Sequence, residues 1–341
     1  MAAPAAAAAA AAMRLSAVLF VVVATTQQGC EGAPPFDVAD FGARGDGTTL
    51  DTVAVTRALA AAEAAGGGEV VFPSPGVYLT GALSLPSNLL LTIPAGAVVL
   101  GSPHETDYPT LPPMWSVCGR IVTSGPFASP LIGGRQVTNV TIRGGGVLDG
   151  GGFKSFKPRL VQFQRSQGVH IQNMTLQRSG MWTVHFYFVV DASVTDSRII
   201  NPILQSETDG IDIDSSANVY IARNFIQCGD DGVALKSGSD WCGRKWATPT
   251  VNVTIERNFF NFSGGQLAFG SDMSGGVRDV LVQHNTLYGD EDPRRRGGRQ
   301  VVQMERTLAR YCGAARQELA GDSILDTQIV QVLLQVLVVL D

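Results

Sequence analysis

A short pattern of apolar residues and asparagine recurs along this chain and constrains its fold more than any other feature. The pattern is apolar, any residue, apolar, then asparagine or a small residue three positions on and an apolar residue two further. Clear copies begin at Val219, Val253 and Val280, and weaker copies begin at Val140, Val169 and Ala192. Successive copies lie 23 to 34 residues apart, and glycine punctuates short β-branched runs without a sustained helical period. We therefore predict an all-β solenoid, a parallel β-helix with variable loops.

The clear copies carry Asn224, Asn258 and Asn285 at the polar position of the pattern. Stacked coils bring residues one coil apart to about one strand spacing, ~4.8 Å. We interpret these asparagines as an internal ladder at a turn rather than as a row of binding residues.

Residues 53–65, before the repeats, form an alanine-rich segment with helical character. Asp51 is a suitable N-cap for it, and the glycines at 66–68 are a clear stop signal. A solenoid needs an end cover, because its first coil otherwise exposes an apolar face and open strand edges. We expect this helix to cap the solenoid and short strands to follow it near residues 69–73, 76–79 and 89–93.

The two ends of the chain differ from the repeat region. Residues 1–33 combine an alanine-rich start with Met13, Arg14 and a short apolar run, which together are typical of a secretory signal peptide. We expect residues 34–289 to form the β-helix domain and residues 290–341 to form a divergent, poorly ordered tail. The apolar runs are shorter than the ~20 residues that a membrane span requires, so we expect no membrane partner. The predicted location is extracellular, including the cell wall.

Charge and cysteine usage exclude several classes of function. The net charge is −5, with 25 Lys and Arg against 30 Asp and Glu, so no basic field is present to hold nucleic acid. No metal-ligand spacing is matched by the five cysteines Cys30, Cys118, Cys228, Cys242 and Cys312. In an oxidising compartment Cys228 and Cys242 can bridge, but the sequence leaves the connectivity open. We expect a monomer without metal or other cofactor.

Four acceptor sequons support secretion independently of the N-terminal segment. They begin at Asn139, Asn173, Asn252 and Asn261. We expect a glycan on at least one of them, and thus a glycoprotein.

Two acidic clusters lie about one predicted coil apart, at residues 207–210 and 229–232. Their central carboxylates, Asp209 and Asp230, are separated by 21 residues, so stacking of coils can bring them together. Inverting hydrolysis of a glycosidic bond needs an acid for the leaving oxygen and a carboxylate ~6.5–9.5 Å away to activate water. Repulsion among Asp209, Asp230 and Asp231 is expected to raise at least one pKa, which leaves a protonated acid beside an ionised base.

Two other interpretations of these acids remain open from the residues alone. Asp-Gly and Gly-Asp pairs commonly mark turns. Asp209, Asp212 and Asp214 also have the close spacing of a hard-cation site, such as one for calcium, although they do not reproduce the EF-hand loop. Asp212 and Asp214 alternate with Ile211 and Ile213, as in a half-buried strand.

Residues 36–288 resemble glycoside hydrolase family 28, the polygalacturonases. The N-terminal part of the resemblance, at residues 40–47 and 66–73, is shared with other β-helix proteins. The specific part is Thr-Asp-Gly-Ile-Asp at 208–212, Gly-Asp-Asp at 229–231 with Val-Ala-Leu-Lys-Ser-Gly at 233–238, and Gly-Ser-Asp-Met-Ser-Gly-Gly at 270–276. These segments follow in the family's order and spacing.

The resemblance implies a right-handed parallel β-helix that hydrolyses α-1,4 bonds between galacturonates with inversion and without a metal. Asp230 is then the general acid, and Asp209 and Asp231 share the activation of water. Lys236 and Glu207 are the candidate substrate-binding residues, with Lys236 a partner for substrate carboxylates. Pectin, or polygalacturonate, is the implied partner.

Three departures from the family pattern surround these residues. Glu207 stands where the family usually has asparagine, and its negative charge is expected to weaken the binding of a polyanion. Gly265 aligns with the histidine of the family's Gly-His-Gly motif, and neither His185 nor His284 is assigned as its replacement. The basic Arg-x-Lys motif expected just after residues 287–289 is absent, which removes cations that hold the substrate carboxylate.

The leading hypothesis is a secreted polygalacturonase-type hydrolase that modifies pectin in the cell wall. The alternative is a catalytically impaired β-helix protein that binds pectic polysaccharide without cleaving it. The three departures favour this alternative, while the intact set of Asp209, Asp230 and Asp231 argues against it. A lyase would normally use calcium and a basic catalytic side chain, and the sequence offers no convincing site for either.

Overall fold

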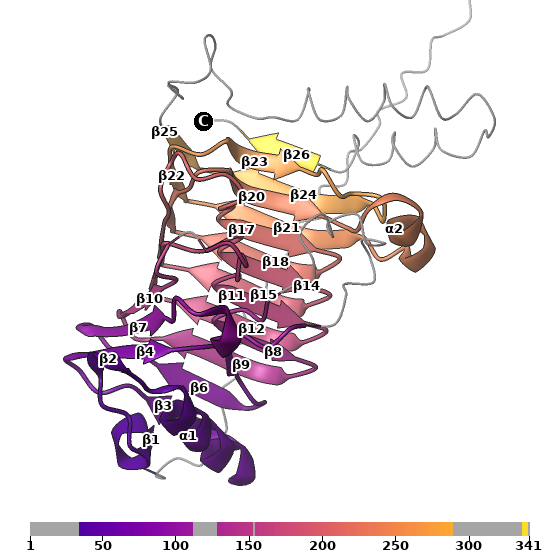
Figure 1. Cartoon of the computed structure of the whole chain (residues 1–341). Helices are drawn as coiled ribbons and strands as arrows, with labels where there is room; N and C mark the ends of the chain where they lie inside the picture. Colours follow the sequence, from indigo (N-terminus) through magenta and orange to yellow (C-terminus); the bar gives the residue numbers. More distant parts are fainter. Residues whose placement is uncertain (1–33, 112–127, 153, 289–335, 340–341) are drawn as a thin grey trace, which may run out of the picture.

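The computed structural model describes residues 34–111, 128–152, 154–288 and 336–339. Within these residues, three long parallel sheets run side by side along the molecule, and successive coils add one strand to each sheet (Figure 1). We name them sheets A, B and C. The predicted parallel β-helix is therefore confirmed, while the N-terminal signal segment and most of the predicted C-terminal tail lie outside the described residues.

Within each sheet the strands follow one another in space in the order of the chain. Sheet A contains β1 (Phe36–Asp37), β3 (Gly68–Val71), β6 (Leu89–Thr92), β9 (Thr138–Arg143), β12 (Gln167–Gln172), β15 (Val190–Thr195), β18 (Ala217–Ala222), β21 (Thr250–Glu256), β24 (Val277–Gln283) and β26 (Val336–Val339). Sheet B contains β2 (Asp46–Leu50), β4 (Gly76–Thr80), β7 (Ala97–Gly101), β10 (Val147–Asp149), β13 (Thr175–Gln177), β16 (Arg198–Ile200), β19 (Phe225–Gln227), β22 (Phe259–Asn261) and β25 (Thr286–Tyr288). Sheet C contains β5 (Leu83–Ser84), β8 (Ile132–Arg135), β11 (Val161–Gln164), β14 (Val184–Tyr187), β17 (Ile211–Asp214), β20 (Asp231–Lys236) and β23 (Gly265–Phe269).

The six residues at which the sequence pattern begins lie in one row across sheet A. Each pairs in register with the next, in the order Val140, Val169, Ala192, Val219, Val253 and Val280. All six side chains are buried in the core between the sheets. Burying a side chain such as valine stabilises the fold by about 1.5–3 kcal/mol, and each row repeats that gain coil after coil. The repeat in the sequence is thus the repeat of the core.

The asparagine ladder is confirmed at the turn between sheets A and B. The backbone N–H and the side-chain amide of Asn224 both donate to Oδ1 of Asn258, each at 3.0 Å. Asn258 makes the same two bonds to Oδ1 of Asn285, at 2.9 and 3.0 Å. The ladder therefore satisfies buried turn amides and fixes one coil above the next.

Helix α1 (Thr52–Ala64) covers the N-terminal end of the solenoid, as predicted (Figure 1). Its buried face is formed by Val55, Ala58, Leu59 and Ala62. Asp51 is the N-cap residue, as predicted, but its side chain makes no capping hydrogen bond to the helix. Its carboxylate instead accepts the backbone N–H groups of Arg44 and Gly45, at 2.8 and 3.1 Å, in the preceding loop. The predicted strands near residues 69–73, 76–79 and 89–93 are β3, β4 and β6.

The sequence analysis missed three helical segments. Helix α2 (Asp240–Trp246) follows β20, and two short 3-10 helices span Val38–Phe41 and Glu105–Asp107. In the described part of the chain, no helix has the length and apolar character needed to cross a bilayer.

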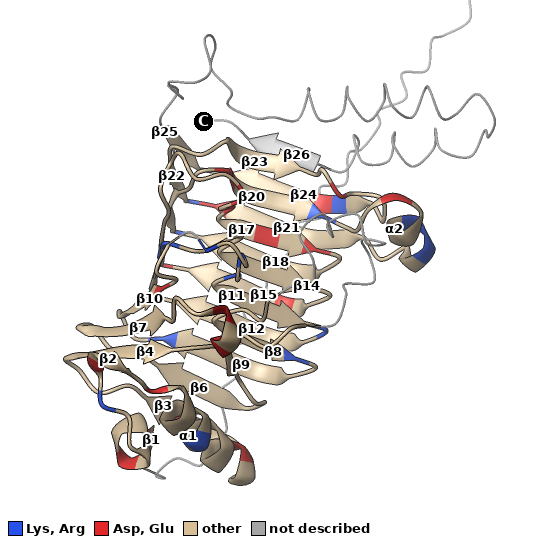
Figure 2. Cartoon of the chain, viewed as in Figure 1, with Lys and Arg blue, Asp and Glu red and all other residues tan. Residues whose placement is uncertain are grey.

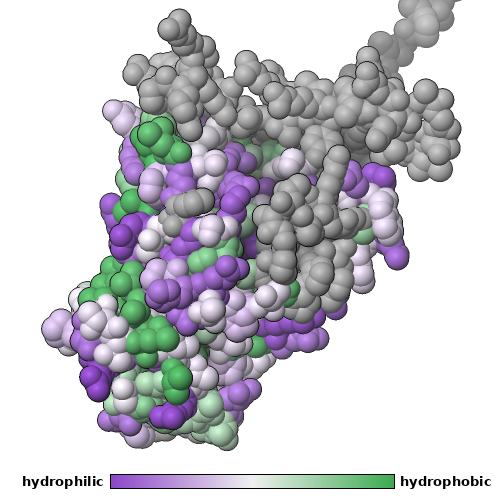
Figure 3. Space-filling model, in the orientation of Figure 1, coloured by the Kyte–Doolittle hydropathy of each residue, from purple (hydrophilic) through white to green (hydrophobic). Residues whose placement is uncertain are grey.

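Charged residues are sparse along the strands and lie mainly at strand ends and in connections (Figure 2). The surface shown in Figure 3 is mainly polar, with apolar patches over the side on which sheet B lies. Exposed rings on sheet B include Phe259 and Tyr288, which stack with a centroid separation of 6.3 Å. Sheet C carries several buried ionisable side chains in its central strands, including Asp212 and Asp214 of β17 and Lys236 of β20.

We predict that Asn258→Ala destabilises the protein by about 2–4 kcal/mol, because each buried donor left without a partner costs about 1–3 kcal/mol. Both donors of Asn224 lose their acceptor in this variant. The free energy of unfolding in urea measures the effect. Ser84→Ala is the control, since Ser84 is exposed at the end of β5 and such changes usually stay within about 0.5 kcal/mol. Equal losses in the two variants would contradict a structural role for the ladder.

Candidate active site

The three aspartates singled out in the sequence lie on two neighbouring coils at the same edge of sheet C. Asp209 stands two residues before β17, and Asp231 begins β20 directly after Asp230. The N–H of Gly210 donates to the carbonyl of Asp231 at 2.8 Å, which joins the two coils at this point. The structure therefore brings Asp209, Asp230 and Asp231 together across 21 residues of sequence.

Glycines in these motifs are required by the close approach of the coils. A Cβ on Gly210 would lie 2.4 Å from the carbonyl oxygen of Gly232, and one on Gly229 would lie 2.0 Å from that of Gln205. The fully buried Thr208 links the two coils, because its hydroxyl donates to the Gln205 carbonyl and accepts the N–H of Gly229. The small and polar residues around the acids thus set the spacing of the acids.

Asp209 is almost completely buried, and its environment changes its acidity. Burial raises the pKa of Asp209 to about 6; the Lys236 ammonium opposes this rise and the Asp230 carboxylate adds to it. Nζ of Lys236 lies 3.9 Å from Oδ2 of Asp209. The side chain is therefore ionised above about pH 6, as a group that accepts a proton from water must be.

Lys236 lies inside the molecule rather than on its surface. Its Nζ lies 3.4 Å from Oδ1 of Asp212, donates to the carbonyl of Gly270 at 3.1 Å, and stands 4.8 Å from the ring centroid of Trp182. Burial lowers the pKa of Lys236, but Asp212 and Asp209 outweigh burial, so the net shift is upward. Substrate binding by Lys236 stays a prediction, and these contacts make it the counter-ion of the acids.

Asp212 and Asp214 lie beside the candidate site in a setting that the sequence analysis missed. The prediction of a half-buried strand is wrong, because Ile211 and Ile213 face the core while Asp212 and Asp214, on the opposite face of β17, are buried as well. Burial and the Asp209 charge raise the pKa of Asp212 well above its usual range. Among the described residues, no group of three potential ligands is placed to hold a metal ion.

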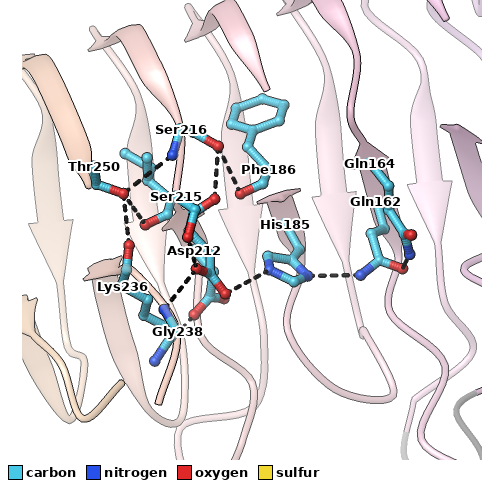
Figure 4. Close-up of polar contacts among 12 residues, drawn as sticks. Gln162, Gln164, His185, Phe186, Asp212, Ser215, Ser216, Lys236, Gly238 and Thr250 are labelled. Carbon is cyan, nitrogen blue, oxygen red and sulfur yellow. Dashed lines mark hydrogen bonds and ion pairs between the residues drawn. The ribbon is translucent and has the colours of Figure 1, made fainter. Parts of the chain in front are cut away.

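A chain of polar contacts crosses sheet C, and Figure 4 shows the part of it in which His185 points toward Gln162. Asp214 accepts the N–H of Gly238 at 3.1 Å and lies 3.9 Å from Nε2 of His185, whose Nδ1 is 2.7 Å from Nε2 of Gln162. Burial, with Arg159 and Lys236, lowers the pKa of His185 well below its usual range, so the imidazole is neutral. His185 thus belongs to a buried structural network, while His284 is exposed on the turn after β24.

Asp230 and Glu207 are linked through the backbone. The N–H of Glu207 donates to Oδ2 of Asp230 at 2.8 Å. The carboxylate of Glu207 forms an ion pair with Lys157, which comes from the connection between β10 and β11. The extra negative charge expected at position 207 is therefore balanced by a cation that the sequence analysis did not single out.

The other departures take the following positions. Gly265, which aligns with the family histidine, begins β23 and pairs in register with Asp231. The residues expected to carry the Arg-x-Lys motif lie outside the described part from residue 289 onward. The suggested Cys228–Cys242 bridge is wrong, because Cys242 is disulfide-bonded whereas Cys228 is a free, buried thiol beneath the carbonyls of Asp230 and Asp231.

The protein is therefore a parallel β-helix whose stacked coils group carboxylates at one edge of sheet C. Glycoside hydrolases use a site with paired carboxylates of this kind. The model of glycosyl hydrolases family 28 matches residues 122–295, about half of the sequence, and the chain belongs to this family. The resemblance seen in the sequence is thereby confirmed.

Relatives and solved structures agree with this assignment. A "Probable polygalacturonase" of Vitis vinifera is 35% identical over 270 residues, which cover 74% of this chain and 55% of the relative. An "Endo-polygalacturonase" of Pectobacterium carotovorum subsp. carotovorum is 28% identical, with 74% of this chain and 66% of the relative covered. The crystal structure of an exopolygalacturonase from Thermotoga maritima superposes with a TM-score of 0.66 at 26% identity, covering 74% of this chain and 67% of that one. The chain thus spans little more than half the length of the Vitis vinifera relative.

We predict that the stability difference between the wild type and Asp214→Asn falls as the pH rises from 4 to 7. Burial raises the pKa of Asp214 from 3.8 to about 6, so the folded state binds an extra proton between these values and loses that stabilisation above about pH 6. The expected decrease is about 3 kcal/mol, at about 1.4 kcal/mol for each pKa unit. Urea unfolding at several pH values measures it.

Asp196→Asn is the control of opposite sign, because Arg223 lowers the pKa of the exposed Asp196. Its contribution is lost as the pH falls through the lowered pKa. A difference for Asp214→Asn that stays constant or grows between pH 4 and 7 would show that Asp214 does not bury its charge.

Proposed function

We propose that this chain is a polygalacturonase-type hydrolase that cleaves α-1,4 bonds between galacturonates in pectic polysaccharide, with inversion. The observation that carries the proposal is the grouping of Asp209, Asp230 and Asp231 on neighbouring coils at one edge of sheet C. Membership of glycosyl hydrolases family 28 and the names of the relatives support the same substrate class.

In the proposed mechanism, Asp230 donates a proton to the glycosidic oxygen as that bond breaks. Asp230 is only partly buried, and the N–H of Glu207 orients one of its carboxylate oxygens. Asp209 and Asp231 activate a water molecule, which attacks the anomeric carbon from the opposite face and gives up its proton to them. Burial favours the neutral form of Asp209, and the ammonium of Lys236 opposes this effect by lowering the pKa of Asp209.

Asp212 and Lys236 support this chemistry from behind the acids. Nζ of Lys236 lies 3.4 Å from Oδ1 of Asp212 within the protein, so removal of Asp212 would take away one of the two carboxyl groups beside the buried ammonium. We propose that this pair holds the position and charge of Asp209 during the reaction. No step of the proposed mechanism requires a cofactor.

We propose that the protein is secreted and acts on pectin in the cell wall. Of the four sequons, Asn139 and Asn173 are exposed. Asn252 and Asn261 are partly buried. Their side-chain amides donate to Asn218 and Gln227 of the preceding coil, each at 2.8 Å, whereas the amide of Asn139 makes a longer bond to Asn88, at 3.3 Å. The exposed pair therefore offers the more accessible glycan acceptors.

We predict that secretion from a eukaryotic host adds N-glycans at Asn139 or Asn173 in preference to Asn252 and Asn261. Accessibility of the acceptor amide is the physical reason. Mass spectrometry of peptides treated with a glycosidase that converts the glycan-bearing asparagine to aspartate measures occupancy at each sequon. Occupancy confined to Asn252 and Asn261, or no secreted product at all, would contradict the proposal.

We predict that Asp230→Asn lowers the release of reducing ends from polygalacturonate by about 10²- to 10⁴-fold, the contribution typical of a general acid. Asp196→Asn, which removes a carboxylate at the turn between β15 and β16, serves as the control and is expected to retain activity. Circular dichroism and thermal unfolding verify that each variant is folded. Absence of activity in folded wild-type protein would favour the alternative of a β-helix protein that binds pectic polysaccharide without cleaving it.

A further inference from the structure

An ion pair at the rim of the site links the connection before β11 to the acidic edge of sheet C. Lys157 and Glu207 contribute its two charges, and their side chains are 31% and 47% exposed. The backbone N–H of Glu207 bonds to Oδ2 of Asp230. The ammonium of Lys157 is therefore an accessible cation whose partner, Glu207, contacts the proposed general acid directly.

Other cations in this region are committed to internal partners. Lys236 is buried against Asp212 and Asp209. Arg159 is fully buried, with its guanidinium 4.7 Å from the ring centroid of Trp182. Arg178 makes several hydrogen bonds to the buried Asp149. Lys157 differs from these residues because its partner is itself an exposed side chain.

We propose that Lys157 binds the carboxylate of a galacturonate residue beside the scissile bond, and that the Glu207 carboxylate occupies this position in the free protein. The inference rests on the proposed function, since a uronate substrate supplies the competing carboxylate. Lysine binds such a group through a charge-assisted hydrogen bond, as it does the Glu207 carboxylate in the free protein. The ion pair between Lys157 and Glu207 thus has the same chemistry as the proposed contact between Lys157 and the substrate carboxylate.

Energetics allow this exchange. An exposed ion pair contributes only about 0–1 kcal/mol, so a polymer held by other contacts can displace the Glu207 side chain. The bond from Glu207 to Asp230 uses the main chain and does not depend on where the carboxylate points. After displacement, Glu207 remains near the substrate and repels its charge. Substitution of Glu207 is therefore expected to strengthen binding, and substitution of Lys157 to weaken it.

Binding is measured by titration calorimetry with a defined oligogalacturonate at low ionic strength, in an Asp231→Asn background that prevents turnover. Asp231 is chosen because Asp230 accepts the Glu207 N–H. We expect Glu207→Gln to lower Kd about two- to fivefold and Lys157→Met to raise it about fivefold. In the Lys157→Met background, the gain from Glu207→Gln is expected to shrink, because competition for the lysine is gone. Both effects are expected to vanish with the fully methyl-esterified oligomer.

Asp196→Asn and Arg223→Met are the charge-matched controls. These residues form an exposed ion pair at the turn between sheets A and B, away from sheet C, with an N–O distance of 2.7 Å. Neither control is expected to change Kd. Thermal unfolding of every variant verifies the fold.

Three results would overturn the inference. One is an unchanged Kd in Lys157→Met, and another is an equal gain from Glu207→Gln with and without Lys157, which would indicate general repulsion. The third is the absence of oligogalacturonate binding in all variants. Cleavage by the chain with Asp231 intact, combined with unchanged Kd values, rejects this inference but leaves the proposed hydrolase. Variant-dependent binding without cleavage retains the lysine site and rejects the hydrolase.

Discussion

Parallel pairing between successive coils holds equivalent residues about one strand spacing apart, ~4.8 Å, and the site depends on this register. The register is maintained by rows of buried apolar residues, by the asparagine ladder and by contacts too close for any side chain at Gly210 and Gly229. Because Asp209 and Asp231 are joined through the Gly210 N–H, the separation of the acids follows from the same pairing that stabilises the fold. The register of the strands therefore both stabilises the solenoid and positions the aspartates.

The acidic edge is supported by charges that are expensive to bury. Asp209, Asp212 and Asp214 lie inside the protein with Lys236 and Arg159 as the nearby cations, and burial shifts each carboxyl toward its neutral form. Such groups are tolerated inside a fold only when they are paired or protonated. At Asp209 the Lys236 ammonium, 3.9 Å away, offsets part of the cost of burying the carboxylate charge.

The features that follow from the repeated pattern could be predicted from the sequence alone. The starts of all six copies, the asparagine ladder and the proximity of Asp209 to Asp231 follow from a period that can be read along the chain. The capping helix was predicted from local composition and from the glycine stop that follows it. The burial of Asp212 and Asp214 was not predictable, because alternation along β17 indicates one exposed face and does not reveal what covers it. Lys157 was missed for a related reason: its contact with Glu207 joins two irregular connections 50 residues apart in the sequence, and such connections carry no periodic signal.

The connections between coils vary in length while the register of the strands stays constant. Insertions and deletions in these connections can accumulate over evolutionary time without moving the acids, because the strands before and after each loop remain paired. One-residue shifts within β17 or β20 would instead turn the inward and outward faces over. Changes of length are therefore tolerated better in the connections than in the paired strands that hold the aspartates in place.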